Sequence, residues 1–153
     1  MQDDIAVRQA QLDDAETITE FNIAMAQETE NKKLDPRTIL AGVHGLLNKP
    51  EYGFYLVAES GGRIAGCLLI TFEWSDWRNG LFWWIQSVYV LPEFRRQGVY
   101  RRLYNAVQER GRKERVCGFR LYVEKENLAA MQTYCRLGMF ETPYRIYERE
   151  TCS

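Results

Sequence analysis

Apolar positions repeat along the chain with two different periods, and the difference separates strands from helices. Short alternating or wholly apolar runs, which are typical of strands, occupy residues 5–10, 54–58, 64–74 and 81–90. The Ser60-Gly61-Gly62 sequence predicts a hairpin turn between the second and third of these runs. Up to Val90 the pattern therefore predicts an antiparallel meander.

Four other segments have the three-to-four-residue spacing of an amphipathic helix. Each begins at a residue suited to a helix N-terminus, in chain order Asp13 or Asp14, Asp35-Pro36, Gly98 and Asn127. The third helix is expected to end near Arg115, and Gly138 closes the fourth as a C-terminal glycine.

Two more strands are expected, at residues 117–123 and 144–150. The element order is then β-α-α-β-β-β-α-β-α-β, an α/β protein with a sheet of mixed direction. No repeat or linker interrupts residues 1–153, and 153 residues fit one domain of ordinary size.

Composition and charge narrow the class of function. The chain is 46% hydrophobic and 27% charged, as soluble globular proteins are. Its net charge is −1, but residues 1–35 hold nine acids and three bases, whereas residues 95–120 hold nine bases and two acids. This balance argues against a nucleic-acid partner and allows the later segment to hold a phosphate-bearing ligand.

Metal sites, export and membrane insertion are not expected. Four cysteines without a CxxC pair, together with the single histidine His44, exclude a zinc ribbon and argue against a histidine-dependent triad. The acidic start lacks the apolar run of a signal peptide, and no stretch approaches 18 uncharged apolar residues. The prediction is a cytoplasmic protein with reduced thiols and no membrane partner.

The most informative segment runs from Val88 to Leu103, where a strand ends, an arginine- and glycine-rich turn follows, and a helix begins. The first amides of a helix point outward without internal partners, and the helix dipole favours an anion there. Gly98 permits close approach of a phosphate, and Arg95, Arg96 and Arg101 add charge. A solvated basic helix with a glycine in its first turn is the alternative.

Two motifs in this chain resemble those of the GCN5-related N-acetyltransferase (GNAT) superfamily. The motif A pattern, Q/R-x-x-G-x-G/A, is matched by Arg95 and Gly98, but Tyr100 stands where the family usually has Gly or Ala. The motif B pattern, N-x-x-A-x-x-x-Y-x-x-x-G-F, is matched at Asn127, Ala130, Tyr134 and Gly138, with Phe140 one place late. The order of elements over about 5–150 also fits the family.

The resemblance implies a GNAT-like, mostly antiparallel sheet of six to seven strands flanked by four helices. It implies direct transfer of an acetyl group from acetyl-CoA to a primary amine through a tetrahedral intermediate, without a metal. The Val88 amide would hold the oxyanion, and Tyr134 would protonate the departing thiolate. The implied cofactor-binding residues are Val88, Val90, Arg95, Arg96, Gln97, Gly98, Val99, Tyr100, Arg101, Asn127 and Tyr134.

The resemblance leaves the proton acceptor open. Many family members carry a glutamate in the strand where this chain has Gln86, and a glutamine takes no proton. Candidate bases are Glu73, Asp76, Glu28 and Glu124, of which Glu73, at a strand end near the acceptor side, is the one we predict. Each can also be an ordinary surface carboxylate. The missing carboxylate leaves a second function open, a CoA-binding regulatory module with little turnover.

Aromatic residues gather at 72–84, and they bear on the partners. Consecutive Trp83 and Trp84 point to opposite faces of a strand, so only one can belong to the same core layer. The other either lines a pocket for an amine-bearing acceptor, a small molecule or a peptide, or is buried in a homodimer. A homodimer is predicted, and the acceptor itself is not identified by the sequence.

Overall fold

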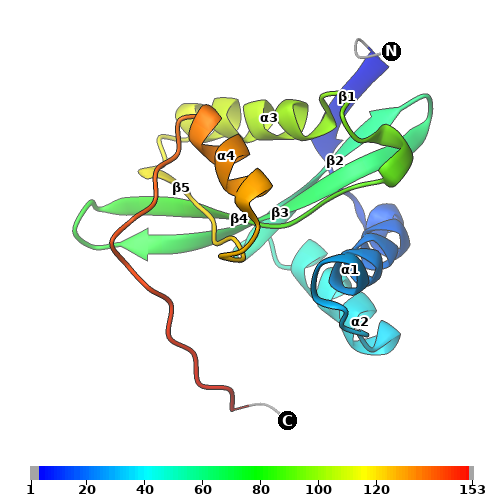
Figure 1. The fold of residues 1–153 in the computed structure, drawn as a ribbon, viewed down its shortest axis with the longest axis horizontal. Coiled ribbons are helices and arrows are strands. Elements are labelled where there is room, and N and C mark those ends of the chain that lie inside the picture. Colours follow the sequence, from blue (N-terminus) through cyan, green and yellow to red (C-terminus); the bar gives the residue numbers. More distant parts are fainter. Residues whose placement is uncertain (1–3, 152–153) are drawn as a thin grey trace. The chain divides into compact units, whose positions relative to one another are not determined.

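The computed structural model describes residues 4–151, and the chain divides into two units, Met1–Leu121 and Tyr122–Ser153. The first unit contains nearly all of the regular structure (Figure 1). Its strands are β1 (Ile5–Gln9), β2 (Gly53–Ser60), β3 (Arg63–Ser75), β4 (Gly80–Val90) and β5 (Gly118–Arg120). Its α-helices are α1 (Ala15–Glu30), α2 (Pro36–Leu47) and α3 (Val99–Lys113).

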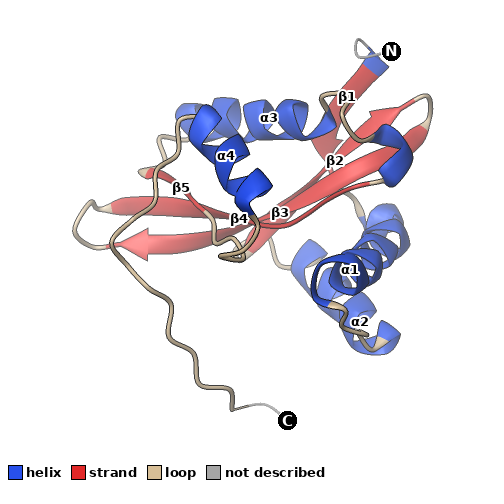
Figure 2. Cartoon of the chain, viewed as in Figure 1, coloured by secondary structure: helices blue, strands red, loops and turns tan. Residues whose placement is uncertain are grey.

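The five strands form one sheet in the order β1-β2-β3-β4-β5. The first four pair antiparallel, which confirms the meander, and β5 pairs parallel with β4 after the α3 crossover. The expected six to seven strands are wrong for the described residues. Residues 144–150 form no strand, because they join no ladder, and Tyr144, Ile146 and Tyr147 are 70%, 64% and 92% exposed (Figure 2).

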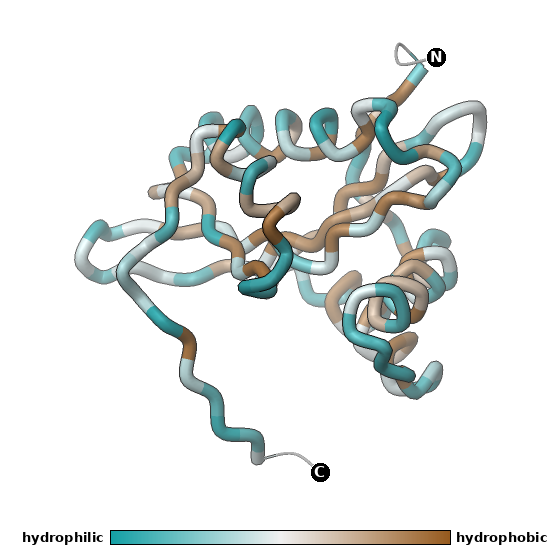
Figure 3. The backbone as a smooth tube through the Cα atoms, viewed as in Figure 1, coloured by the Kyte–Doolittle hydropathy of each residue, from teal (hydrophilic) through white to brown (hydrophobic). Residues whose placement is uncertain are grey.

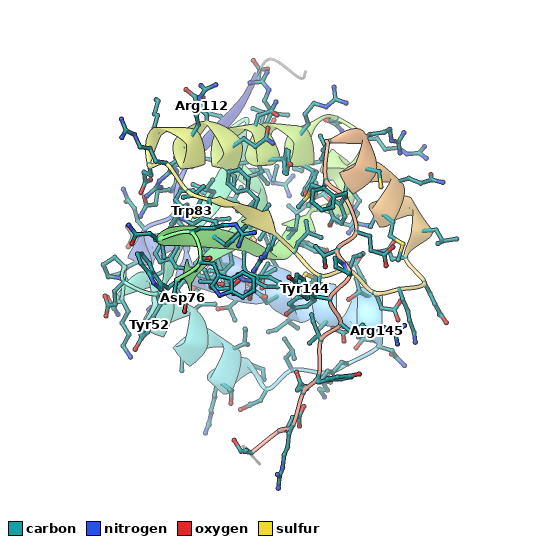
Figure 4. All side chains as sticks on the ribbon, turned by 90° about the vertical axis from the view of Figure 1, so that its left-hand side faces the viewer. Tyr52, Asp76, Trp83, Arg112, Tyr144 and Arg145 are labelled. Atoms are coloured by element: carbon teal, nitrogen blue, oxygen red, sulfur yellow. The ribbon has the colours of Figure 1, made fainter. Side chains whose placement is uncertain are left out.

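Helices cover both faces of the sheet in the first unit, with α1 and α2 on one face and α3 on the other (Figure 1). Under α1 and α2, the core includes Ile18, Phe21, Val43, Tyr55 and Val57. Under α3, the largest buried side chain is Trp83, whose ring lies 5.2 Å from Phe54 and 6.2 Å from Phe119. The apolar segments follow the strands and the inner helix faces (Figure 3), and Trp83 lies between the sheet and α3, with Arg112 on the outer side of that helix (Figure 4).

Two glycines allow α3 and the neighbouring strands to approach closely. A Cβ on Gly111 would lie 2.5 Å from the Phe119 ring, and one on Gly66 would lie 2.8 Å from the Tyr89 carbonyl oxygen and 3.1 Å from Cγ1 of Val99, the first residue of α3. These distances are shorter than van der Waals contact, so only glycine fits at these positions. The start and the end of α3 are thereby fixed against the sheet.

The second unit contains α4 (Leu128–Arg136), whose ends form as the sequence predicts. The Asn127 side chain caps the helix by accepting the Ala130 N–H at 3.2 Å. At the other end Gly138 has φ 92°, and the N–H groups of Gly138 and Met139 donate to the carbonyls of Cys135 and Tyr134. This is a Schellman C-cap. Across residues 4–151, every helix is too short or too polar to cross a bilayer.

An ion-pair network fastens β1 to the start of α1. The Arg8 guanidinium donates to both oxygens of Asp14, at 2.8 and 2.9 Å, and to Glu59 at 2.8 Å. Asp14 is only 7% exposed and also accepts the Gln11 N–H at 2.7 Å. The hydrogen bonds from Arg8, more than any other contact, hold the pKa of Asp14 below its usual range.

An Asp14→Asn substitution should destabilise the fold by about 1–3 kcal/mol at pH 7, because it breaks a buried charged hydrogen-bond pair. A lowered folded-state pKa contributes stability above the unfolded pKa of about 3.9, and that contribution is lost as pH falls through the folded value. The difference from wild type should therefore shrink in urea titrations below about pH 4. Asp13→Asn, at an exposed neighbour, is the control. Equal destabilisation by both substitutions would contradict the assignment.

Candidate active site

A β-bulge interrupts β4 at Ser87 and Val88. Cys67 pairs with Tyr89 and Leu69 pairs with Gln86, so one β3 residue, Leu68, faces two residues of β4. Ser87 has φ 50°, a left-handed conformation that costs a non-glycine residue about 1 kcal/mol or more. Strain of this kind inside a strand is typical of functional sites.

The bulge orients the Ser87–Val88 peptide relative to the Cys67 side chain. The buried Cys67 thiol lies 3.9 Å from the Ser87 carbonyl oxygen, so that carbonyl faces Cys67. The C=O and N–H of a trans peptide point in opposite directions, and the N–H of Val88 therefore points away from Cys67. Burial raises the pKa of the Cys67 thiol to about 12.

β4 has an open edge beyond Trp84. β5 pairs only with Phe82–Trp84, and within residues 4–121 no strand pairs with that edge of Ile85–Val90. The Leu91 N–H donates to the Ala65 carbonyl of β3 at 2.8 Å, so the N–H and C=O of Val90, one residue earlier, face the open edge. The Val90 carbonyl accepts a hydrogen bond from Arg95 Nε at 2.9 Å.

The loop after β4 forms a concave set of backbone amides. After a short 3-10 turn, η3 (Pro92–Phe94), Arg96 and Gly98 have φ 63° and 85°. Alternation with left-handed residues makes the N–H groups converge, as in anion-binding nests. The first hydrogen bond of α3 runs from the Arg102 N–H to the Gly98 carbonyl, so the Val99, Tyr100 and Arg101 amides precede it.

Side-chain contacts hold this loop in place. Gln97 donates to the Glu93 carbonyl at 2.9 Å, and the Glu93 carboxylate pairs with Arg63 at 2.9 Å. Tyr100 stacks along α3 on Tyr104, with 6.1 Å between ring centroids. The exposed guanidinium groups around the amides are those of Arg95, Arg96 and Arg101.

Glu28, in the last turn of α1, bridges β4 and the loop. One carboxylate oxygen accepts the Tyr89 hydroxyl at 2.6 Å, and the other accepts Arg95 at 2.9 Å. These two donors, Tyr89 first, lower the pKa of Glu28. The pKa of Tyr89 is raised by burial and by Glu28, and Glu28 also raises the pKa of Arg95. Glu28 is therefore a charged anchor with both oxygens occupied.

A second set of polar side chains lies on β3 and on the part of β4 that precedes the bulge, where both strands are half-buried. Gln86 donates from Nε2 to the Thr71 hydroxyl at 2.8 Å. Farther along, Oε1 of Glu73 accepts from the Trp84 indole at 2.8 Å and from Arg120 at 2.9 Å. Trp83 is 1% exposed and Trp84 half-buried, which confirms that they occupy opposite faces.

Within the first unit, the structure brings one set of the expected residues together. Val88, Val90 and the 95–101 loop lie together along the β4 edge. Asn127 and Tyr134 belong to the second unit, where Glu124 caps a turn by accepting the Glu126 N–H. Asp76 is exposed in the β3–β4 turn (Figure 4), and His44 is exposed on α2.

Sequence reasoning missed three features of this region: the left-handed Ser87, the bridge from Glu28 to Arg95, and the contact between Arg120 and Glu73. The polar Gln86-Ser87 pair within an otherwise apolar strand is a signal for the first. The other two depend on contacts between residues distant in the chain and leave no local signal.

A family model described as the acetyltransferase (GNAT) family matches residues 13–139. The chain belongs to this family. A solved structure titled a possible acetyltransferase from Clostridium difficile 630 is similar to this GNAT chain, with 45% identity and a TM-score of 0.91. The alignment covers 97% of this chain and 99% of that one. No curated protein matches.

Two more distant structures share the GNAT fold and carry ligands in their titles. A predicted acetyltransferase with acetyl-CoA from Clostridium acetobutylicum has 14% identity and a TM-score of 0.78, covering 95% of this chain and 96% of that one. AAC(6')-Iy in complex with a bisubstrate analog has 23% identity and a TM-score of 0.74, covering 97% and 99%. At these identities the likeness concerns the fold alone.

A Gly98→Ala substitution should weaken the binding of acetyl-CoA by tenfold or more, about 1.4 kcal/mol, as measured by calorimetry. A Cβ there meets no protein atom within 4 Å, so the methyl group would stand in the open space before the loop amides. Gly62→Ala is the matched control, because Gly62 has φ 78° and equally empty surroundings in the β2–β3 turn. Equal affinity of the two variants for acetyl-CoA would contradict the assigned loop.

Proposed function

We propose that this GNAT chain transfers an acetyl group from acetyl-CoA to a primary amine by direct attack of the amine on the thioester. The observation that carries the proposal is the bulge, which orients the Val88 amide away from the Cys67 side chain, beside an open strand edge and an amide-rich loop. A backbone N–H fixed in this way suits an oxyanion that forms only during reaction.

The proposed reaction has three steps. The lone pair of the neutral amine forms a bond to the thioester carbon, and the carbonyl oxygen becomes an oxyanion held by the Val88 N–H. The C–S bond then breaks, the carbonyl re-forms, and CoA leaves as a thiolate that takes a proton from Tyr134. The nitrogen loses one proton to solvent and the Tyr134 phenolate regains one from solvent, so the products are an amide and the free thiol of CoA.

Cofactor binding is proposed along the β4 edge and the following loop. The pantetheine arm would pair with Val90 and contact Asn127, and the pyrophosphate would bind the loop amides. Arginine donors close to these amides would complete the phosphate site. The proposed residues of the loop are Arg95, Arg96, Gln97, Gly98, Val99, Tyr100 and Arg101.

Glu73 suits an orienting role better than direct proton transfer. It pairs with Phe82, and the bulge begins five residues farther along β4, roughly 17 Å away at strand spacing. One of its oxygens is held by Trp84 and Arg120. We therefore propose that Glu73 fixes the Trp84 indole on the acceptor side.

Binding of the cofactor is tested by thermal unfolding with acetyl-CoA, with ATP as a phosphate control. At 100 times its dissociation constant, a ligand stabilises by about 2.7 kcal/mol. For a chain of this size the midpoint should rise by roughly 5–10 °C with acetyl-CoA and not with ATP. No rise at millimolar acetyl-CoA would refute the proposal. Binding without acetylation of any amine in a broad panel would favour the regulatory module.

A Tyr134→Phe substitution should lower kcat by about 100-fold or more, because the departing thiolate would lose its proton donor. The dissociation constant for acetyl-CoA should stay the same. The control is Tyr147→Phe, at a side chain that is 92% exposed. Unchanged turnover in Tyr134→Phe, measured by release of free CoA thiol, would exclude Tyr134 as the donor.

A further inference from the structure

Gln86 directly precedes the bulge and has a fixed side-chain amide. Its Nε2 donates to the Thr71 hydroxyl at 2.8 Å, so the amide plane is set by a neighbour on β3. The carbonyl end of the side chain is then left as a hydrogen-bond acceptor. A carbonyl oxygen accepts an N–H bond from an amine and does not remove its proton.

The face of β4 that carries Gln86 lies on the α1 and α2 side of the sheet and is less completely buried than the α3 side. The opposite face of β4 is filled under α3, where Trp83 and Ile85 are 1% and 3% exposed. Thr71 and Gln86 are only half-buried, and their polar groups point to the other face.

The carboxylates of the elements packed around Gln86 are already engaged or distant. From α1, Glu28 has both oxygens occupied by Tyr89 and Arg95. From β3, Glu73 lies roughly 17 Å along the strand from the bulge and is paired with Arg120 of β5. Within residues 4–121, neither of these two carboxylates is therefore placed to act in the position of Gln86, which precedes Ser87 and Val88 in β4.

We propose that Gln86, oriented by Thr71, binds the acceptor nitrogen, and that the enzyme selects amines already largely uncharged near neutral pH, such as α-amino groups, over alkylammonium groups. The inference rests on the proposed acetyl transfer and names its acceptor class. Gln86 accepts one N–H, which directs the nitrogen lone pair toward the thioester. The proton that the nitrogen releases goes to solvent, because a glutamine cannot hold it.

As the pKa of an amine rises, its neutral fraction falls and its nucleophilicity rises. The effect on the neutral fraction is the larger of the two. With pKa values near 7.8 and 10.4, the neutral fraction of an α-amino group exceeds that of a lysine side chain by roughly 300-fold at pH 7.4. The more basic nitrogen attacks faster once it is neutral. With a Brønsted slope of about 0.5, as for thiolates, its rate constant is higher by roughly 20-fold. The α-amino group should therefore keep roughly a tenfold advantage.

The experiment uses acceptors that carry both an α-amino nitrogen and a side-chain amino nitrogen. Lysinamide, ornithinamide and lysyl-alanine amide are incubated with acetyl-CoA and enzyme at pH 7.4, and the acetylated nitrogen is identified by NMR. We expect at least tenfold more acetylation of the α-nitrogen. Preference for the side-chain nitrogen would overturn the inference.

The pH dependence gives a second readout, measured with the best acceptor of the amine panel. We expect kcat/KM to rise tenfold per pH unit up to the pKa of that amine. A profile that levels off well below this pKa would show a protein base at work and would overturn the inference.

Variants test Gln86 itself. Gln86→Glu supplies a carboxylate, so side-chain acetylation should rise at least tenfold relative to α-acetylation at pH 7.4. The same change at exposed Gln108 is the control. Thr71→Val keeps the shape of the side chain and should lower kcat/KM about tenfold without changing acetyl-CoA affinity. If Gln86→Glu behaves like Gln108→Glu and Thr71→Val like wild type, the role of Gln86 is refuted.

The two proposals fail in different ways. If wild-type protein binds acetyl-CoA and acetylates no amine, the proposed transfer is wrong and the acceptor class falls with it. If amines are acetylated but the alkylammonium nitrogen is preferred, only the acceptor class is wrong.

Discussion

The extra residue in β4 is the constraint on which the site depends, because it reverses the alternation of side chains along the strand. Before the bulge, Trp83 and Ile85 face α3. Without the extra residue, Tyr89 would also face α3. With the extra residue, Tyr89 pairs with Cys67, and its ring centroid lies 5.3 Å from that of Phe21 in α1. Only in this arrangement can the Tyr89 hydroxyl reach Glu28. One left-handed residue thus connects α1, the strand and the loop that follows it.

The same connection explains why the loop is both charged and ordered. Arg95 uses two of its N–H groups on Val90 and Glu28, and a guanidinium has five. The remaining donors stay available while the side chain is held. An arginine restrained in this way loses less entropy on meeting a phosphate than one that is free in solvent.

Features set by local chemistry were predictable from the sequence, and features set by distant pairing were not. The Asp35-Pro36 start of α2, the Asn127 cap and the Gly138 terminus depend on a few neighbouring residues, and all three form as expected. Residues 144–150 have the composition of a strand, but a strand also needs a partner. The bulge was missed for the same reason, since it is a mismatch between Leu68 and two residues about twenty positions away.

The burial of the Cys67 thiol has a chemical consequence. This thiol lies 3.9 Å from the Ser87 carbonyl oxygen of the bulge. Thiols attack thioesters as thiolates, and burial raises the pKa of the Cys67 thiol to about 12, far above neutral pH. Burial therefore keeps the Cys67 thiol protonated, and in the proposed reaction this thiol would not compete with the amine as a nucleophile.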